Sequence, residues 1–128
     1  MSLKKDCEAI IMNRKEVFAY AKDKFNTTPV YKWVKNPNYA VLQHEASGKW
    51  YGLIMNISKS KIGLKGEGVI DIMNVKCDPV MREFLRNKEG ILPAYHMNKK
   101  YWMTIVLESS FPKDQIYNLI DISYNLTK

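Results

Sequence analysis

The chain has 128 residues, 46% of them hydrophobic and 26% charged, and its 20 Lys and Arg outnumber its 13 Asp and Glu, which gives a net charge of +7. This composition indicates one globular domain over residues 1–128, and it excludes a disordered tail and a disulfide-rich secreted protein. A membrane-spanning protein is excluded as well, because no apolar run is long enough to cross a bilayer. We therefore expect a reduced, cytoplasmic protein with no membrane partner.

The first predicted element is a helix that begins at Asn13. This residue can cap a first turn, and Glu16 follows it three positions later. Apolar residues then recur at helical spacing and form one buried face, which comprises Val17, Tyr20, Ala21 and Phe25. The helix ends at 26–29, because a residue that precedes proline is pushed out of helical geometry.

Five strands are predicted from β-branched, aromatic or alternating residues, over 30–35, 39–45, 49–57, 69–77 and 101–108. A three-residue link at 46–48 contains glycine and is typical of a β-hairpin.

In the third strand, one side is expected to face the core and the other to remain open. The core side comprises Tyr51, Leu53, Met55 and Ile57. The opposite side is partly apolar and comprises Trp50, Gly52, Ile54 and Asn56. An open face of this kind favours dimerisation or binding.

A second helix is predicted from Asp78, a capping residue, with Pro79 at the first helical position. Its buried stripe is predicted as Met81, Phe84 and Leu85. Gly90 is the expected stop, after which residues 91–100 have no regular pattern.

A last helix is predicted from Pro112, with Asp114 in its first turn. Its buried face comprises Ile116, Leu119, Ile120 and Ser123. The resulting order, α-β-β-β-β-α-β-α, predicts a two-layer α+β fold in which helices cover one face of a mainly antiparallel β-sheet.

The positive charge is concentrated in the first half of the chain. Residues 1–64 contain eleven basic and five acidic residues, whereas residues 65–128 contain nine and eight. This bias indicates a polyanionic partner, or it serves only to keep the protein soluble. The basic residues near predicted hairpin ends are Lys49, Lys59, Lys61 and Lys65. They either bind phosphate, with neighbouring aromatic residues available to stack on bases, or protect strand edges.

No catalytic or metal-binding pattern is present in the sequence. The two histidines and two cysteines are isolated, and there is neither a phosphate-binding loop nor a spaced carboxylate pair. We therefore expect no metal, no cofactor and no enzymatic activity. His44 is interpreted as a surface or structural residue. Cys77 precedes a helix start, so it is either a thiol of lowered pKa or a buried, inert one.

The segment 93–102 mixes hydrogen-bond donors, cations and aromatic residues. It could hold an anion, with Lys99 providing charge and Asn98 an amide. Alternatively it locks a loop, with His96 and Asn98 satisfying backbone groups while Trp102 packs into the core.

Several stretches resemble the MmcQ/YjbR family of small bacterial proteins. They are residues 48–53, 74–79, 93–102 and 111–124, and the most specific motif comprises His96, Asn98, Lys99 and Trp102. The resemblance covers about residues 39–126. It implies a two-layer α+β domain similar to frataxin homologues and secretion chaperones.

The resemblance also implies a "double-wing" DNA-binding motif whose wings are β-hairpins. By position, the wings are 46–49 and 58–68, the second of which is longer than the usual family pattern. Iron binding is not carried over from frataxin, because the predicted first helix is basic rather than acidic.

The leading functional hypothesis is a non-enzymatic DNA-binding protein. Its expected phosphate contacts are Lys49, Lys59, Lys61, Lys65, Lys99 and Lys100. The alternatives are a protein-interaction module or homodimer that uses the open sheet face, and a small-ligand or enzyme site around His96.

Overall fold

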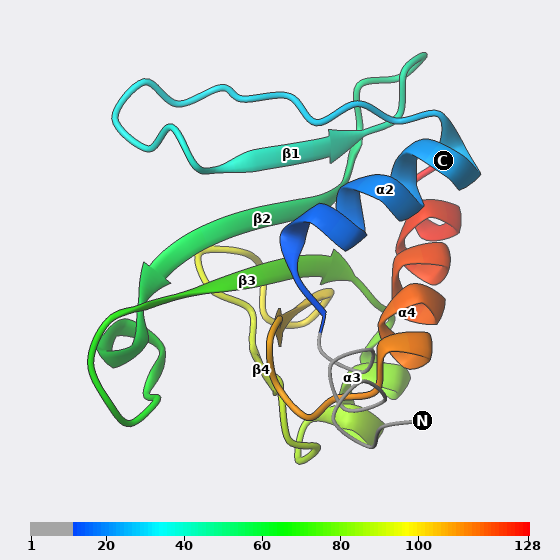
Figure 1. Cartoon of the computed structure of the whole chain (residues 1–128). Helices are drawn as coiled ribbons and strands as arrows, with labels where there is room; N and C mark the ends of the chain where they lie inside the picture. Colours follow the sequence, from blue (N-terminus) through cyan, green and yellow to red (C-terminus); the bar gives the residue numbers. More distant parts are fainter. Residues whose placement is uncertain (1–11) are drawn as a thin grey trace, which may run out of the picture.

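The computed structural model describes residues 12–128 (Figure 1). Its elements in chain order are α2 (Arg14–Phe25), β1 (Ala40–Gln43), β2 (Trp50–Ser58), a short 3-10 turn η1 (Lys59–Ile62), β3 (Val69–Lys76), α3 (Pro79–Leu85), β4 (Ile91–Pro93), β5 (Trp102–Val106) and α4 (Lys113–Leu126). The strands form one antiparallel sheet in the order β1-β2-β3-β5-β4. The predicted α+β fold is therefore confirmed.

Helices α2, α3 and α4 lie on the same face of this sheet (Figure 1). The core between the two layers combines helical residues such as Val17 and Ile120 with strand residues such as Ile54, Met73 and Ile105, all of which are completely or almost completely buried. Burial of this apolar surface is the main favourable contribution to folding.

The helix starts agree with the predictions because capping is local. The Asn13 side chain accepts a hydrogen bond from the Glu16 backbone N–H at 3.0 Å, and Asp78 accepts one from Met81 at 2.9 Å. Pro112 precedes α4, and the four residues predicted on the inner face of that helix are buried.

The predicted extent and inner face of α3 are partly wrong. The helix ends at Leu85 rather than near Gly90, and the Phe84 side chain is 77% exposed. A helix of seven residues turns only a narrow stripe inward, and here that stripe contains Leu85 and the half-buried Met81.

Two strand predictions are also corrected. Residues 30–35 do not form a strand, since only Val30 pairs with β1, in an isolated bridge to Val41. The chain instead leaves the sheet, and Trp33 packs edge-on against Trp50. Conversely, residues 91–100, which were expected to be irregular, contain β4, a strand too short to show a periodicity. This strand ends at Pro93 and lies on the edge of the sheet, where the missing N–H of proline is tolerated.

The second face of the sheet is not open within residues 12–128. A second core lies there, with Leu53, Met55, Ile57 and Ile72 each no more than 5% exposed. Loop residues cover it, and these are Trp33, Tyr39, Ile62, Leu64, Leu92, Tyr95 and Met97. The predicted faces of β2 were therefore reversed: Ile54 lies in the helix-facing core. Residues 12–128 therefore do not present the open face that was assumed for a dimer or interaction module.

A β-bulge in β2 makes Tyr51 and Trp50 exceptions to this reversal. Leu42 pairs with Gly52 and Gln43 pairs with Trp50, so Tyr51 is an extra residue between them. The bulge places Tyr51 on the helix-facing side, while Trp50 packs with the second core. Strict alternation over 50–57 therefore fails at its first residues.

Candidate nucleic-acid interface

The two predicted wings lie at opposite ends of β2. Lys49 immediately precedes the strand, whereas Lys59, Lys61 and Lys65 belong to the connection that follows it. A nine-residue strand is roughly 25–30 Å long at about 3.3 Å per residue. The lysines therefore form two separate groups rather than one.

The connection between β2 and β3 is an ordered turn with an apolar underside. Its ends are joined by a hydrogen bond of 3.0 Å from the Lys59 N–H to the Gly68 carbonyl. Ile62 and Leu64 pack onto the second core, whereas Lys61 and Lys65 are exposed. Anchoring by the apolar residues thus leaves these lysines in solvent.

The β4–β5 loop is fixed partly as predicted. The Asn98 side chain accepts hydrogen bonds from the backbone N–H groups of Lys100 at 2.8 Å and Tyr101 at 3.3 Å, which confirms its role as a lock. His96 does not share that role: it is exposed, adopts a left-handed φ of 58°, and places its ring 3.9 Å from that of Tyr95. Trp102 does not enter the core either, since it is half-buried with the Lys76 ammonium 5.7 Å above its ring.

These two segments meet at a hollow of about 370 Å³. Its lining comprises Lys61, Ile62, Leu92, Pro93, Ala94, Tyr95, His96 and Lys99. The fold therefore brings together three residues proposed from the sequence, Lys61, His96 and Lys99. Lys59, Lys65 and Lys100 belong to the same two segments without lining the hollow, and Lys49 lies at the other end of β2.

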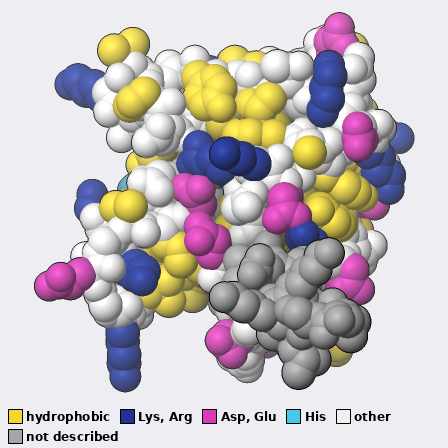
Figure 2. Space-filling view, in the orientation of Figure 1, with side chains coloured by type: hydrophobic (Ala, Val, Ile, Leu, Met, Phe, Trp, Pro, Cys, Tyr) yellow, Lys and Arg dark blue, Asp and Glu magenta, His cyan; other side chains and the backbone are white. Residues whose placement is uncertain are grey.

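The six predicted lysines are available for an external anion. The salt bridges within residues 12–128 use Arg14, Lys24, Arg86 and Lys113, and none of the six. Figure 2 shows basic side chains projecting from the lobe at lower left, where Figure 1 places η1 and the turn after it. Glu67 is the one acidic residue of that connection. The hollow is thus bordered by positive charge that forms no salt bridge within the described part of the chain.

His44 and Cys77 have structural roles. The His44 side chain is buried, and its Nε2 lies 2.8 Å from the Thr127 hydroxyl. Burial lowers the pKa of His44 below 6.5, and the charges of Lys128 and Lys49 act in the same direction. Burial raises the pKa of the Cys77 thiol to about 11, which confirms the inert interpretation. Cys7 lies outside the described residues.

Neither a metal-binding cluster nor a membrane-spanning helix is found within residues 12–128. Among them, no three His, Cys, Asp or Glu side chains gather where they could hold a metal ion. None of the helices in this part of the chain has the length and apolar character that crossing a membrane requires.

Sequence comparison relates the chain to one family. The family model described as YjbR matches residues 22–126. Protein YyaQ of Bacillus subtilis (strain 168) is 52% identical over 118 residues, which cover 92% of this chain and 100% of YyaQ. Protein YjbR of Escherichia coli (strain K12) is 40% identical over 53 residues, which cover 41% of this chain and 45% of that protein.

Solved structures agree with this relationship. The crystal structure of a Pseudomonas syringae protein has a TM-score of 0.89 and 42% identity, and the match covers 91% of this chain and 100% of that one. A Deinococcus radiodurans protein has a TM-score of 0.63 over 91% of this chain and 78% of that one. Its identity is 18%, so this second likeness concerns the fold alone.

Proposed function

The chain belongs to the YjbR family, and on that basis we propose that it is a cytoplasmic, non-enzymatic DNA-binding protein whose basic connections contact the phosphate backbone. The observation that carries the proposal is the meeting of Lys61 and Lys99 at one hollow, although 38 positions separate them in the sequence. Cations that line one hollow and form no salt bridge within residues 12–128 favour a polyanion over isolated anions, because each phosphate contact releases condensed counterions.

The separation of the two wings limits how they act. Phosphates follow one another about every 3.4 Å along one DNA strand, so wings roughly 25 Å apart correspond to about seven base pairs. Lys49 therefore contacts a different part of the backbone from Lys61 and Lys99. Contacts of this kind provide affinity with little reading of sequence.

The test is a fluorescence-anisotropy titration of a labelled 20-base-pair duplex at several salt concentrations. We expect the logarithm of the binding constant to fall steeply with the logarithm of salt. In the variant Lys61→Gln/Lys99→Gln the slope should become shallower by about two, since each phosphate contact contributes about one.

The matched control is Lys15→Gln/Lys88→Gln, which removes the same charge from two exposed sites outside both wings. It should leave the slope unchanged. No binding at low salt, a binding constant independent of salt, or equal losses in the two variants would refute the proposal.

A further inference from the structure

Three loops that cover the second core carry most of the net positive charge. They are residues 31–39 before β1, residues 59–68 between β2 and β3, and residues 94–101 between β4 and β5. Together they contain seven lysines and one glutamate, whereas the other described residues include eleven basic and ten acidic ones. We call the surface that these loops form the loop face. The surplus charge is therefore gathered on the loop face rather than spread over the molecule.

Apolar side chains hold all three loops against the same side of the sheet. Those that pack on the second core are Trp33, Tyr39, Ile62, Leu64, Tyr95 and Met97. The first loop is fixed further by the Trp33 ring, whose centroid lies 5.8 Å from those of Tyr39 and Trp50, edge-on to both. This anchoring leaves the lysines between the apolar residues in solvent, and those that are exposed are Lys32, Lys35, Lys61, Lys65, Lys99 and Lys100.

The first two loops leave the sheet at the same end. β1 and β2 are antiparallel, with Ala40 at the start of β1 opposite Ile54 in β2, so the start of β1 lies towards the end of β2. Figure 1 shows both loops projecting on one side of the molecule, and Figure 2 shows basic side chains on both lobes, with the surface set back between them. Lys32 and Lys35 thus share this side with Lys61, although they belong to neither predicted wing.

The lysines of the loop face are available to a partner. The salt bridges within residues 12–128 involve none of them, and Glu67 is the one acidic residue of the three loops. Each lysine that contacts a phosphate releases condensed counterions, so affinity for a polyanion grows with the number of contacts.

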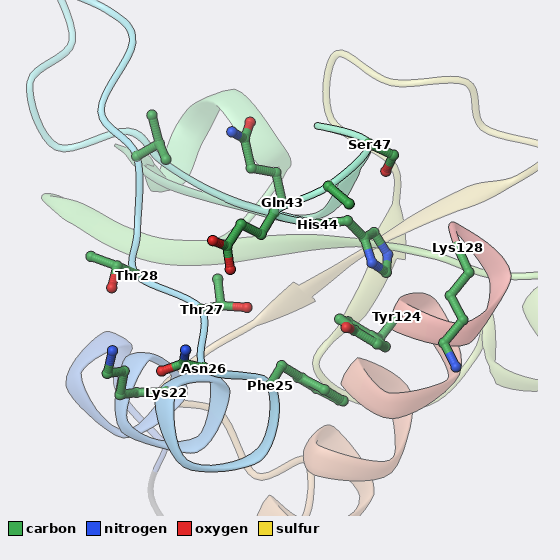
Figure 3. Close-up of a pocket in the computed structure, with 13 residues that line it drawn as sticks. Lys22, Phe25, Asn26, Thr27, Thr28, Gln43, His44, Ser47, Tyr124 and Lys128 are labelled. Carbon is green, nitrogen blue, oxygen red and sulfur yellow. The ribbon is translucent and has the colours of Figure 1, made fainter.

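The larger hollow of about 780 Å³ does not belong to this surface, since it lies at the other end of β2 (Figure 3). Lys22 and Lys128 line it from opposite sides. The Tyr124 ring is covered there by Phe25 and His44, whose ring centroids lie 3.8 and 4.2 Å away. This hollow therefore offers neither gathered cations nor an open aromatic surface, unlike the loop face.

An anionic lipid surface suits the loop face less well than DNA does. The large apolar residues exposed on it are Tyr31, Val34 and Tyr101, of which only Val34 is aliphatic. One valine provides less apolar area than stable anchoring to a membrane surface requires. The hollow lined by Lys61 and Lys99 also fits a projecting backbone better than a flat surface.

We propose that the whole loop face binds DNA, and that Lys32 and Lys35 contact phosphates together with Lys61 and Lys99. This inference rests on the DNA-binding proposal and adds to it a loop outside both predicted wings. Because the loop before β1 and the β2–β3 connection project from the same end of the sheet, they contact neighbouring parts of the backbone.

The test adds the variant Lys32→Gln/Lys35→Gln to the anisotropy titrations of the labelled duplex. Each phosphate contact contributes about one to the salt slope, so the slope should become shallower by about two. Combined with Lys61→Gln/Lys99→Gln, it should become shallower by about four. The control Lys15→Gln/Lys88→Gln removes two positive charges outside the loop face and should leave the slope unchanged.

The outcomes separate this inference from the proposal on which it rests. Failure of the wild-type chain to bind the duplex would overturn both. If the duplex binds and Lys61→Gln/Lys99→Gln reduces the slope while Lys32→Gln/Lys35→Gln does not, the DNA-binding proposal stands and the role of residues 31–39 is refuted. Equal losses in Lys32→Gln/Lys35→Gln and in the control would reduce the effect to net charge and refute it as well.

Two further measurements check the position of the interface and the class of partner. On addition of the duplex, backbone amide shifts of the isotopically labelled chain should concentrate in the three loops and leave α4 unchanged, and shifts that spare residues 31–39 would overturn the inference. Vesicles of phosphatidylcholine and phosphatidylserine should bind more weakly than the duplex. Tighter vesicle binding that Val34→Ser abolishes would assign the loop face to lipid instead.

Discussion

Ser123 on α4 donates its hydroxyl hydrogen to the backbone carbonyl of Tyr51 on β2, 2.6 Å away. The same hydroxyl accepts a hydrogen bond of 2.8 Å from the backbone N–H of Lys76 on β3. The β2–β3 ladder stops at the pair Gly52–Val75, so Tyr51 and Lys76 are the next two residues and are not paired with each other in that ladder. A side chain from the helical layer thus replaces a missing bond of the sheet.

Replacing Ser123 with alanine should therefore destabilise the fold. The change leaves a buried carbonyl and an N–H unpaired, and each unsatisfied buried group costs about 1–3 kcal/mol. We expect the free energy of unfolding in urea to fall by about 2 kcal/mol or more. The exposed Ser110 provides the control, since Ser110→Ala should change stability very little. Equal stability of the two variants would contradict this role of the Ser123 hydroxyl.

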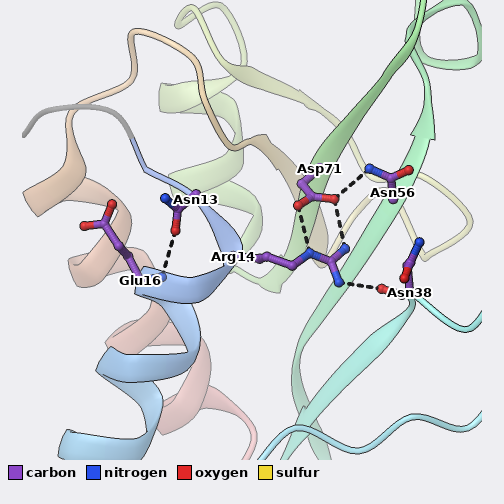
Figure 4. A network of polar contacts seen from close by, with 6 residues as sticks. All are labelled: Asn13, Arg14, Glu16, Asn38, Asn56 and Asp71. Carbon is purple, nitrogen blue, oxygen red and sulfur yellow. Dashed lines mark hydrogen bonds and ion pairs between the residues drawn. The ribbon is translucent and has the colours of Figure 1, made fainter. Parts of the chain in front are cut away.

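Arg14 and Asp71 form a second long-range link, between α2 and β3 (Figure 4). The Arg14 Nε and Nη2 atoms donate to the two Asp71 carboxylate oxygens at 2.8 and 2.9 Å, and Asn56 donates to Asp71 at 3.0 Å. Burial alone would raise the pKa of Asp71, but these hydrogen bonds and the Arg14 charge lower it below 3.8.

The sign of the pH dependence follows from this lowered pKa. As the pH is lowered, Asp71 is protonated in the unfolded chain before it is protonated in the folded protein. The contribution of the ionised Asp71 to the free energy of unfolding is therefore complete above pH 3.8 and is lost as the pH falls through the lower pKa of the folded state. Asp71→Asn should reduce the free energy of unfolding by about 1.5–3 kcal/mol at pH 7 and should flatten its decline below pH 3.8. Urea titrations from pH 2.5 to 7 measure both effects, and an unchanged acid profile would exclude Asp71 as their source.

Two glycines with positive φ should respond differently to alanine. At Gly48, with φ +74°, a Cβ would meet open space, so Gly48→Ala adds only backbone strain of about 1–2 kcal/mol. At Gly90, with φ +89°, a Cβ would lie 2.5 Å from the Ser109 hydroxyl oxygen and 2.9 Å from the Phe111 Cβ. Overpacking then adds about 1–3 kcal/mol. Thermal unfolding should therefore show a clearly lower Tm for Gly90→Ala, and a reversed order would disprove the steric argument.

Asn74 supports the loop that carries His96 and Lys99. It is fully buried, its Nδ2 donates to the Tyr95 carbonyl at 2.8 Å, and its Oδ1 accepts from the Thr104 hydroxyl. Asn74→Ala should expose the amides of the β4–β5 loop to faster hydrogen exchange, because the Tyr95 carbonyl loses its partner. Under the DNA-binding proposal, duplex affinity should fall several-fold as well. The exposed Asn118 on α4 supplies the control Asn118→Ala, and equal exchange in the two variants would argue against this support.

Features that depend on nearby residues were predictable from the sequence, whereas features that depend on long-range pairing were not. Caps at Asn13 and Asp78 were predictable because a cap depends on residues three positions apart. The three-residue strand β4 was not, since its extended geometry comes from pairing with β5 rather than from its own pattern. The faces of residues 53–57 were reversed because both sides of the strand are apolar. Tyr51 is not reversed, because it belongs to a bulge that depends on the partner strand.

By itself, the sequence determined the helix starts, the main strands, the family and the surplus of lysine, because each of these depends on composition or on residues close together in the chain. Only the tertiary structure decided that Lys61 meets Lys99 and that Lys22 and Lys128 share a hollow. Those neighbours are set by strand order and by packing of the helical layer on the sheet. Such contacts join segments tens of residues apart, and no local pattern encodes them.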